Sequence, residues 1–234
     1  MEEVNGIHEL RARIRDAEAA VNPLTEWTEI LNDHLNFGNN GKLSDQIGVF
    51  NFNSATDCLN LGTDRCQVSE GDCYAKNNER FPNALSYRRR QEIVWDHLDP
   101  ATFADAFDRV ARRKRTDVSI LRLSQSGDFR NRHDVLKAEA IANILAPQYD
   151  VYTYTASSWL PFDETDTLTV NASNPNIDSA DRRFVVVDDV ESIPEDGIRC
   201  PEDLSDGEVE CGQCRLCIDK DAGNVYIQNL YADD

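Results

Sequence analysis

Four cysteines in the last fifth of the chain are spaced for a metal site. They have ten, two and two residues between successive members: Cys200, Cys211, Cys214 and Cys217. Four thiolates complete a tetrahedral shell, which suits either a structural zinc ion or a four-iron, four-sulfur (4Fe-4S) cluster. The surrounding segment has few apolar residues, so bound metal would supply folding free energy there. The spacing predicts a closed metal site and leaves both zinc and iron–sulfur open.

Three further cysteines form an earlier group with no fourth cysteine nearby. Cys58, Cys66 and Cys73 are separated by seven and six residues. Three sulfur ligands on a 4Fe-4S cluster leave one iron open to a small ligand, which is the arrangement that chemistry at a cluster requires. A zinc ion could instead add His97 or a carboxylate, although His97 is more simply an ordinary polar residue on a helix. We expect this front group to hold an open-site iron–sulfur cluster.

Strands and helices are expected to alternate along most of the chain. Runs of β-branched and aromatic residues predict strands over 47–53, 118–123, 151–155, 168–172 and 184–188. Helical periodicity predicts helices over 7–21, 24–35 and 83–97, a fourth beginning at the cap Asp99 and a fifth capped by Asp134. Strands that alternate with helices pair in parallel through right-handed crossovers. The expected fold class is therefore α/β, either a partial (β/α) barrel or a Rossmann-like parallel sheet.

The chain divides into three regions by composition and periodicity. Residues 1–40 form an N-terminal helical segment, and residues 41–192 form the α/β core that contains the three-cysteine loop. Hydrophobic periodicity ends near Val190, so residues 193–234 are expected to be a loop-rich, cysteine-rich, metal-binding tail.

Ligand sites in parallel sheets form where the strands end, at the carboxyl edge. The front cysteines follow the first expected strand, and the turn containing Ser126, Gly127 and Asp128 follows the second. The ends of neighbouring strands lie side by side, so we expect this loop and this turn to meet. Asp128 could also be a carboxylate that caps a turn ahead of a helix.

The charge of the chain is strongly negative and dispersed. Forty-three acidic residues face 24 basic ones, which gives a net charge of −19. Dispersed acids with few lysines are typical of a salt-saturated cytoplasm, where molar salt reduces the Debye length to about 3 Å; an ordinary acidic protein is the alternative. The first 20 residues carry charges throughout and resemble no secretion signal. We therefore expect a cytoplasmic protein of an extreme halophile, in which clustered cysteines bind metal.

Two basic runs are the candidate contacts for nucleic acid. They cover 88–90 and 111–115, and either could touch phosphates. Arginines on a solvated helix surface are the simpler interpretation. No stretch approaches the roughly 20 apolar residues that a membrane span requires. We expect no membrane partner, and nucleic acid has weak support.

Several motifs together resemble a known family. The runs NGKLSDQIGVFNF, CYAKNN, RLSQSGDF, VYTYTASS and ECGQCRLC, which span residues 40–217 approximately, resemble the gene product 88 family of tailed viruses and proviruses. CYA and SGD are also distantly similar to radical S-adenosylmethionine enzymes, although those enzymes space their cysteines more closely. That resemblance implies that Cys58, Cys66 and Cys73 ligate a cluster. It also implies that Gly127 and Asp128, in the turn with Ser126, bind S-adenosylmethionine.

Two functional classes follow from these features. The first is an iron–sulfur enzyme of viral or proviral origin, radical-S-adenosylmethionine-like, that acts on a nucleotide or a modified base. The second is a non-catalytic module, stapled by zinc or iron–sulfur, that binds a host protein or nucleic acid. The open front group favours the enzyme, and the lack of a substrate motif favours the module.

Overall fold

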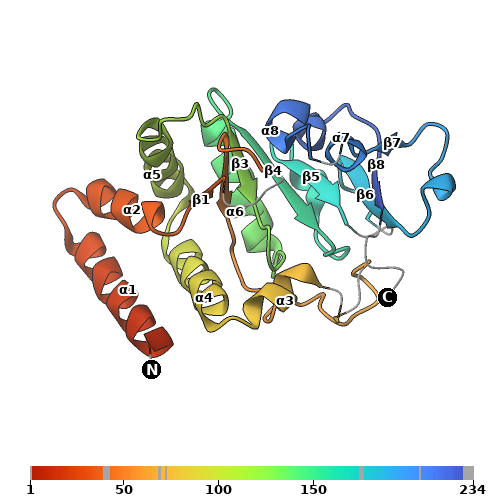
Figure 1. Cartoon of the computed structure of the whole chain (residues 1–234). Coiled ribbons are helices and arrows are strands. Elements are labelled where there is room, and N and C mark those ends of the chain that lie inside the picture. The colour runs from red at the N-terminus through yellow and green to blue at the C-terminus, as the bar shows by residue number, and fades with distance from the viewer. Residues whose placement is uncertain are drawn as a thin grey trace.

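The computed structural model describes residues 2–38, 43–67, 70–71, 73–173, 177–205 and 207–228, with side chains from Gly6 onward. Its strands are β1 (Asn36–Phe37), β2 (Ile47–Phe50), β3 (Ile120–Leu123), β4 (Asp150–Thr155), β5 (Thr169–Ala172), β6 (Arg182–Val187), β7 (Ile198–Arg199) and β8 (Val225–Gln228). They form one sheet in the order β1-β2-β3-β4-β5-β6-β8-β7 (Figure 1). The β1–β2 ladder is antiparallel, and the other ladders among the described residues are parallel.

Helices connect most of the parallel strands. The longer ones are α1 (Glu2–Ala19), α2 (Pro23–Asn32), α4 (Pro82–His97), α5 (Pro100–Arg112) and α6 (Arg132–Leu145). The short ones are α3 (Tyr74–Glu79), α7 (Pro201–Leu204), α8 (Cys211–Cys214), η1 (Phe162–Glu164), η2 (Val190–Ser192) and η3 (Leu216–Ile218). The predicted α/β class is confirmed, and the mostly parallel sheet is consistent with the Rossmann-like alternative.

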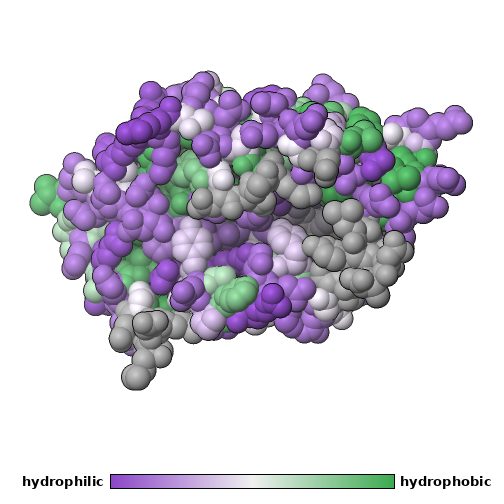
Figure 2. Space-filling model, viewed as in Figure 1, coloured by the Kyte–Doolittle hydropathy of each residue, from purple (hydrophilic) through white to green (hydrophobic). Residues whose placement is uncertain are grey.

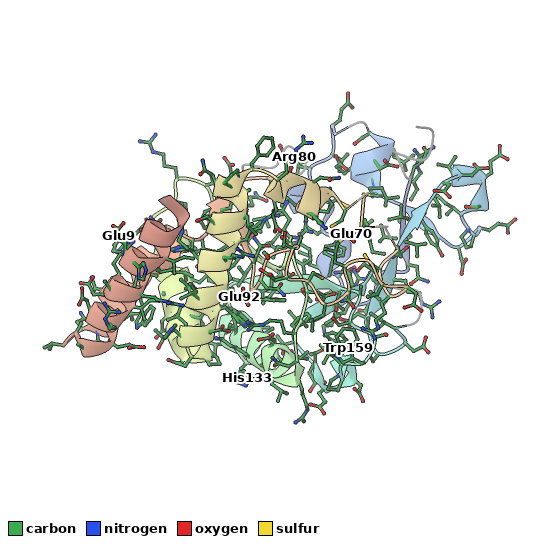
Figure 3. All side chains as sticks on the ribbon, turned by 90° about the horizontal axis from the view of Figure 1, so that it is seen from below. Glu9, Glu70, Arg80, Glu92, His133 and Trp159 are labelled. Carbon is green, nitrogen blue, oxygen red and sulfur yellow. The ribbon has the colours of Figure 1, made fainter. Side chains whose placement is uncertain are left out.

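The two faces of the sheet are covered differently. Successive side chains of a strand point to opposite faces, so Leu121 and Leu123 of β3 lie in the large core while Ile120 lies in a small one. The large core contains apolar residues from all five long helices. Figure 1 shows α1, α2, α4 and α5 gathered to one side of the strands, and Figure 3 shows α1 and α4 next to each other. The long helices therefore cover one face, called here the helical face.

The other face, called here the tail face, is covered by the C-terminal segment. Its small core consists of Leu43, Ile47, Val49, Ile120 and Tyr152, against which Tyr154, Cys211, Cys217 and Ile218 pack. The helices α7 and α8, blue in Figure 1, lie over this side. Parallel sheets need both faces covered, and here a segment with few apolar residues covers the second.

The start of α6 differs from the prediction. The helix begins at Arg132 with Asn131 as its cap, whose side chain accepts a hydrogen bond from the Asp134 backbone N–H at 3.0 Å. The expectation that Asp134 caps the helix is therefore wrong. Asp134 is buried and instead accepts hydrogen bonds from Trp95 Nε1 at 2.8 Å and from Arg130. Trp95, a long-range partner, binds the Asp134 carboxylate. Asn131, three residues earlier, occupies the N-cap position instead.

The tail is more regular than its sequence indicates. It supplies β7 and β8, and β8 pairs in parallel with β6, with Phe184 opposite Val225. The expected loop-rich tail did not include these two strands. The strands are two and four residues long, too short for a local alternation signal to be distinctive.

Both basic runs are engaged by the protein itself. In the first run, Arg88 pairs with Glu79 at 2.8 Å and Arg89 with Asp57 at 3.2 Å. In the second, Arg112 pairs with Asp108 and Arg113 with Glu29, at 2.8 and 2.6 Å. These contacts agree with the interpretation as arginines of a helix surface. Hydrophilic residues cover most of the described surface in Figure 2.

None of the described helices is long and apolar enough to cross a membrane.

Candidate metal centres

The four tail cysteines line a single cavity of about 40 Å³ on the tail face. The sheet supplies one wall of this cavity through Ile47, Ile120, Arg122, Tyr152 and Tyr154. The opposite wall comes from the short helices of the tail, and Glu202 also lines it. The structure thus brings together Cys200, Cys211, Cys214 and Cys217, as the spacing predicts.

The sulfur atoms share the cavity without converging on one point. Within the described ranges, no three His, Cys, Asp or Glu side chains are gathered tightly enough to hold a metal ion. None of the seven cysteines forms a disulfide. The donor set itself fits a metal, because four thiols around a common cavity can complete a closed shell.

Tight turns in the tail place its cysteines at the cavity. Cys200 caps α7, and its backbone N–H donates to Tyr226 O at 2.8 Å, which ties it to β8. Cys211 and Cys214 are the first and last residues of α8. Arg215 then adopts a left-handed φ of 59°, which is uncommon for a residue with a side chain. This reversal carries the chain into η3, where Cys217 turns back toward the cavity.

Buried polar groups hold the last cysteine against the sheet. Asn171 of β5 donates through Nδ2 to Cys217 O at 2.9 Å. The Arg182 guanidinium donates to the carbonyls of Leu216 and Asp219 on either side. Gly212 has no room for a side chain, since a Cβ there would lie 2.0 Å from Ser44 Oγ. These residues position the tail, and no spacing rule in the sequence identifies them.

Burial disfavours the thiolate form of Cys200, Cys211 and Cys217 when no cation is present. Burial raises the pKa of Cys211 to about 12, and the neighbouring Cys217 and Cys200 thiols add to the rise. The pKa values of Cys200 and Cys217 are also raised, again chiefly by burial. A metal cation stabilises thiolates, so binding here releases protons.

The front cysteines lie beyond the end of β2. Burial raises the pKa of Cys58 to about 12, with further contributions from Asp128 and Cys66. The structure therefore places Cys58 within electrostatic range of both residues. Cys73 caps the start of α3, and residues 68, 69 and 72 lie outside the described residues. Ligation by all three front cysteines stays a prediction.

The turn after β3 is built around two asparagines. Asn51 Oδ1 accepts hydrogen bonds from the backbone N–H groups of Gln125 and Ser126, both at 2.8 Å, and Asn53 Oδ1 accepts from Asp128 N at 2.9 Å. Gly127 has φ +73°, and a Cβ there would lie 1.7 Å from Asn53 Oδ1. Only glycine fits this position. In the sequence both asparagines fall inside the strand expected over 47–53, which ends at Phe50 in the structure.

Asp128 joins three loops at the carboxyl edge. Its carboxylate accepts four hydrogen bonds of 2.7 Å, from Asn60 Nδ2, Phe129 N, Thr155 Oγ1 and Ala156 N. The side chain is only 4% exposed, and burial raises its pKa to about 6. The cysteine loop and the turn therefore meet, as expected from parallel strands. A role for Ser126, Gly127 and Asp128 in binding S-adenosylmethionine stays a prediction.

His97 lies beside α1. It is the last residue of α4, and its Nδ1 is 3.3 Å from Glu18 Oε1 of α1. The interpretation of His97 as an ordinary polar residue on a helix agrees with this position.

Comparisons of the chain with protein-family models, with curated proteins and with solved structures find no match.

Proposed function

We propose that this chain is an iron–sulfur protein with a closed four-cysteine centre on the tail face and an open three-cysteine centre at the carboxyl edge. The observation that carries the proposal is that all four tail cysteines line one cavity. A bound 4Fe-4S cluster or zinc ion would cross-link α7, α8 and η3. The protein would then combine a metal-stabilised segment on the tail face with a reactive site at the carboxyl edge of the sheet.

The packing of the tail face supports the closed centre. The small core there has five buried apolar residues, and two of the side chains packed on it are cysteines. Such a core provides little hydrophobic free energy compared with the helical face. Metal binding would supply the missing stabilisation, because ligand assembly and folding of a segment are one process.

The surroundings of the front cysteines support an open centre. His97, the residue that could supply a fourth ligand, is at the end of α4 and contacts Glu18 of α1. The nearby carboxylate of Asp128 has both oxygens occupied by hydrogen-bond donors. The iron that no cysteine ligates would keep a coordination position for a small ligand. Binding that ligand is the chemistry that a cluster would supply at such a site.

Protein purified without oxygen in molar potassium chloride is expected to be brown. Iron and acid-labile sulfide should exceed zinc, because two cysteine groups hold clusters. Cys214→Ser and Cys66→Ser form a matched pair, and each should lose the iron of its own group only. Elemental analysis measures the iron, sulfide and zinc of each protein, and visible absorption measures its colour. Colourless protein with stoichiometric zinc would contradict the proposal and favour the metal-stapled module that binds a host protein or nucleic acid.

A second candidate, a radical-S-adenosylmethionine-like enzyme of viral origin acting on a nucleotide, has two supporting observations. Strands β2 to β6 follow in chain order with the long helices on one face, an arrangement that is also found in (β/α) barrels. Asn60, two residues after Cys58, donates to Asp128 at 2.7 Å. The cysteine loop and the Ser126–Gly127–Asp128 turn therefore share one edge.

Adding S-adenosylmethionine to the reduced protein is expected to change the electron paramagnetic resonance signal of the front centre. Ser126→Ala should weaken this change while the fold persists, because the hydroxyl makes a single 3.1 Å hydrogen bond to Glu79. Ser192→Ala on η2 is the matched control. No spectral change and no cofactor cleavage in the wild-type protein would remove the radical candidate and leave the iron–sulfur assignment intact.

A further inference from the structure

Arg122 of β3 is a half-buried cation with an incomplete set of partners. It lines the four-cysteine cavity, and its Nε atom is buried without a hydrogen-bond partner. Its guanidinium carbon lies 4.8 Å from the Tyr154 ring centroid and 6.0 Å from that of Tyr152. Among the ion pairs formed by the described residues, none includes Arg122.

Arg130 shows one way in which this chain compensates a partly buried guanidinium. Arg130 contacts the carboxylates of Glu92, Asp96 and Asp134 at 3.0, 2.6 and 2.9 Å. Aromatic rings give Arg122 a weaker partner than a carboxylate does. Because a partly buried charge without a counter-charge is costly, the position of Arg122 favours an anion in the adjacent cavity.

The closed centre would be that anion. Four thiolates around a divalent zinc ion, or around a 4Fe-4S core of the same charge, carry a net charge of about −2. Glu202 also lines the cavity and makes the surroundings more negative. The second nearby arginine, Arg182, directs its terminal nitrogens to backbone carbonyls. Arg122 is thus placed to balance the charge of the centre itself.

We infer that Arg122 is the counter-charge for an anionic four-cysteine centre, an inference that rests on the proposed function. Without metal, Arg122 lies beside the four cysteines of the cavity and has no ion-pair partner among the described residues. With metal, the protein holds an anionic centre beside that cation, and each compensates the other. Arg122 acts through the ligands and is a positioning residue, so its removal should have opposite effects on the metal-free and the metal-loaded protein.

Zn²⁺ affinity tests this inference in full-length protein whose front cysteines are replaced by serine, which leaves the tail cysteines as the thiol ligands. Competition against a chromophoric chelator measures the affinity. Arg122→Met is expected to weaken Zn²⁺ binding by about tenfold or more, the range found for partners that surround metal ligands. Arg122→Lys keeps the charge and should retain most of the affinity. Arg132→Met, which removes an exposed arginine paired with Glu164, controls for net charge and should have no effect.

Thermal melting separates charge balance from a merely structural role. Arg122→Met should melt at the same or a higher temperature than its parent without metal, and at a lower temperature with saturating Zn²⁺. Equal destabilisation in both states would overturn the inference, as would unchanged Zn²⁺ affinity. If Arg122→Met does not fold, a folded Arg122→Lys protein that loses affinity tenfold would also overturn it. A parent that binds neither Zn²⁺ nor an iron–sulfur cluster through its tail cysteines would contradict the proposed function instead.

Discussion

Replacing Cys214 with serine is expected to empty the four-cysteine centre and loosen the tail from the sheet. Cys214 ends α8 and lines the cavity, so its loss opens the closed shell. The free energy of unfolding should fall by about 4 kcal/mol or more, the range for losing a metal site. In a chain of this size that corresponds to a fall of about 8–16 °C in melting temperature. Thermal melts of anaerobic protein measure the change.

Limited proteolysis should show which segment loosens in Cys214→Ser. Cleavage between residues 196 and 217 is expected in Cys214→Ser and not in Cys66→Ser, which makes the identical chemical change in the front group. Release of the tail also exposes Ile47 and Ile120, which are 1% exposed in the folded chain, so binding of a hydrophobic dye should rise. Full stability and full metal content in Cys214→Ser would show that the four-cysteine assignment is wrong.

Asp128→Ala is expected to destabilise the whole carboxyl edge. The change leaves four donors from three loops without their acceptor, and each unsatisfied buried donor costs about 1–3 kcal/mol. We expect a loss of at least about 3 kcal/mol, or about 6–12 °C in melting temperature. Asp163→Ala, on the exposed side of η1, is the control and should change stability by no more than about 0.5 kcal/mol. A small effect of Asp128→Ala would contradict the structural role of this carboxylate.

The stability contribution of Asp128 should also depend on pH. Burial raises its pKa from 3.8 to about 6, so the folded chain binds this proton more tightly than the unfolded chain. The contribution is fully present below about pH 4 and is lost as the pH rises through 6. Wild type should lose about 2 kcal/mol relative to Asp128→Asn between pH 4 and pH 6. Denaturant unfolding at pH 4, 5 and 6 measures the difference, and parallel curves would contradict the raised pKa.

The sequence by itself determined the features that depend on local patterns. Asp99 and Pro100 predict the start of α5, and the Asp99 side chain accepts from the N–H groups of Ala101 and Thr102 as a cap should. The alternation of strands and helices predicts the parallel sheet, because crossover handedness leaves few other arrangements. Cysteine spacing identifies the tail group, since ligands of one metal are often close in sequence.

Only the tertiary structure determined which segments of the chain pack or pair with each other. The tail covers the second face of the sheet and adds β8 beside β6, a pairing between segments about 40 residues apart that no local periodicity encodes. Asn51 and Asn53 shape a turn more than 70 residues away. In the sequence, Arg122 is a single charged residue within an apolar strand. Its position among four cysteines follows from the alternation of side chains in β3 and from which segment folds over that face, and both are set by packing of the whole chain.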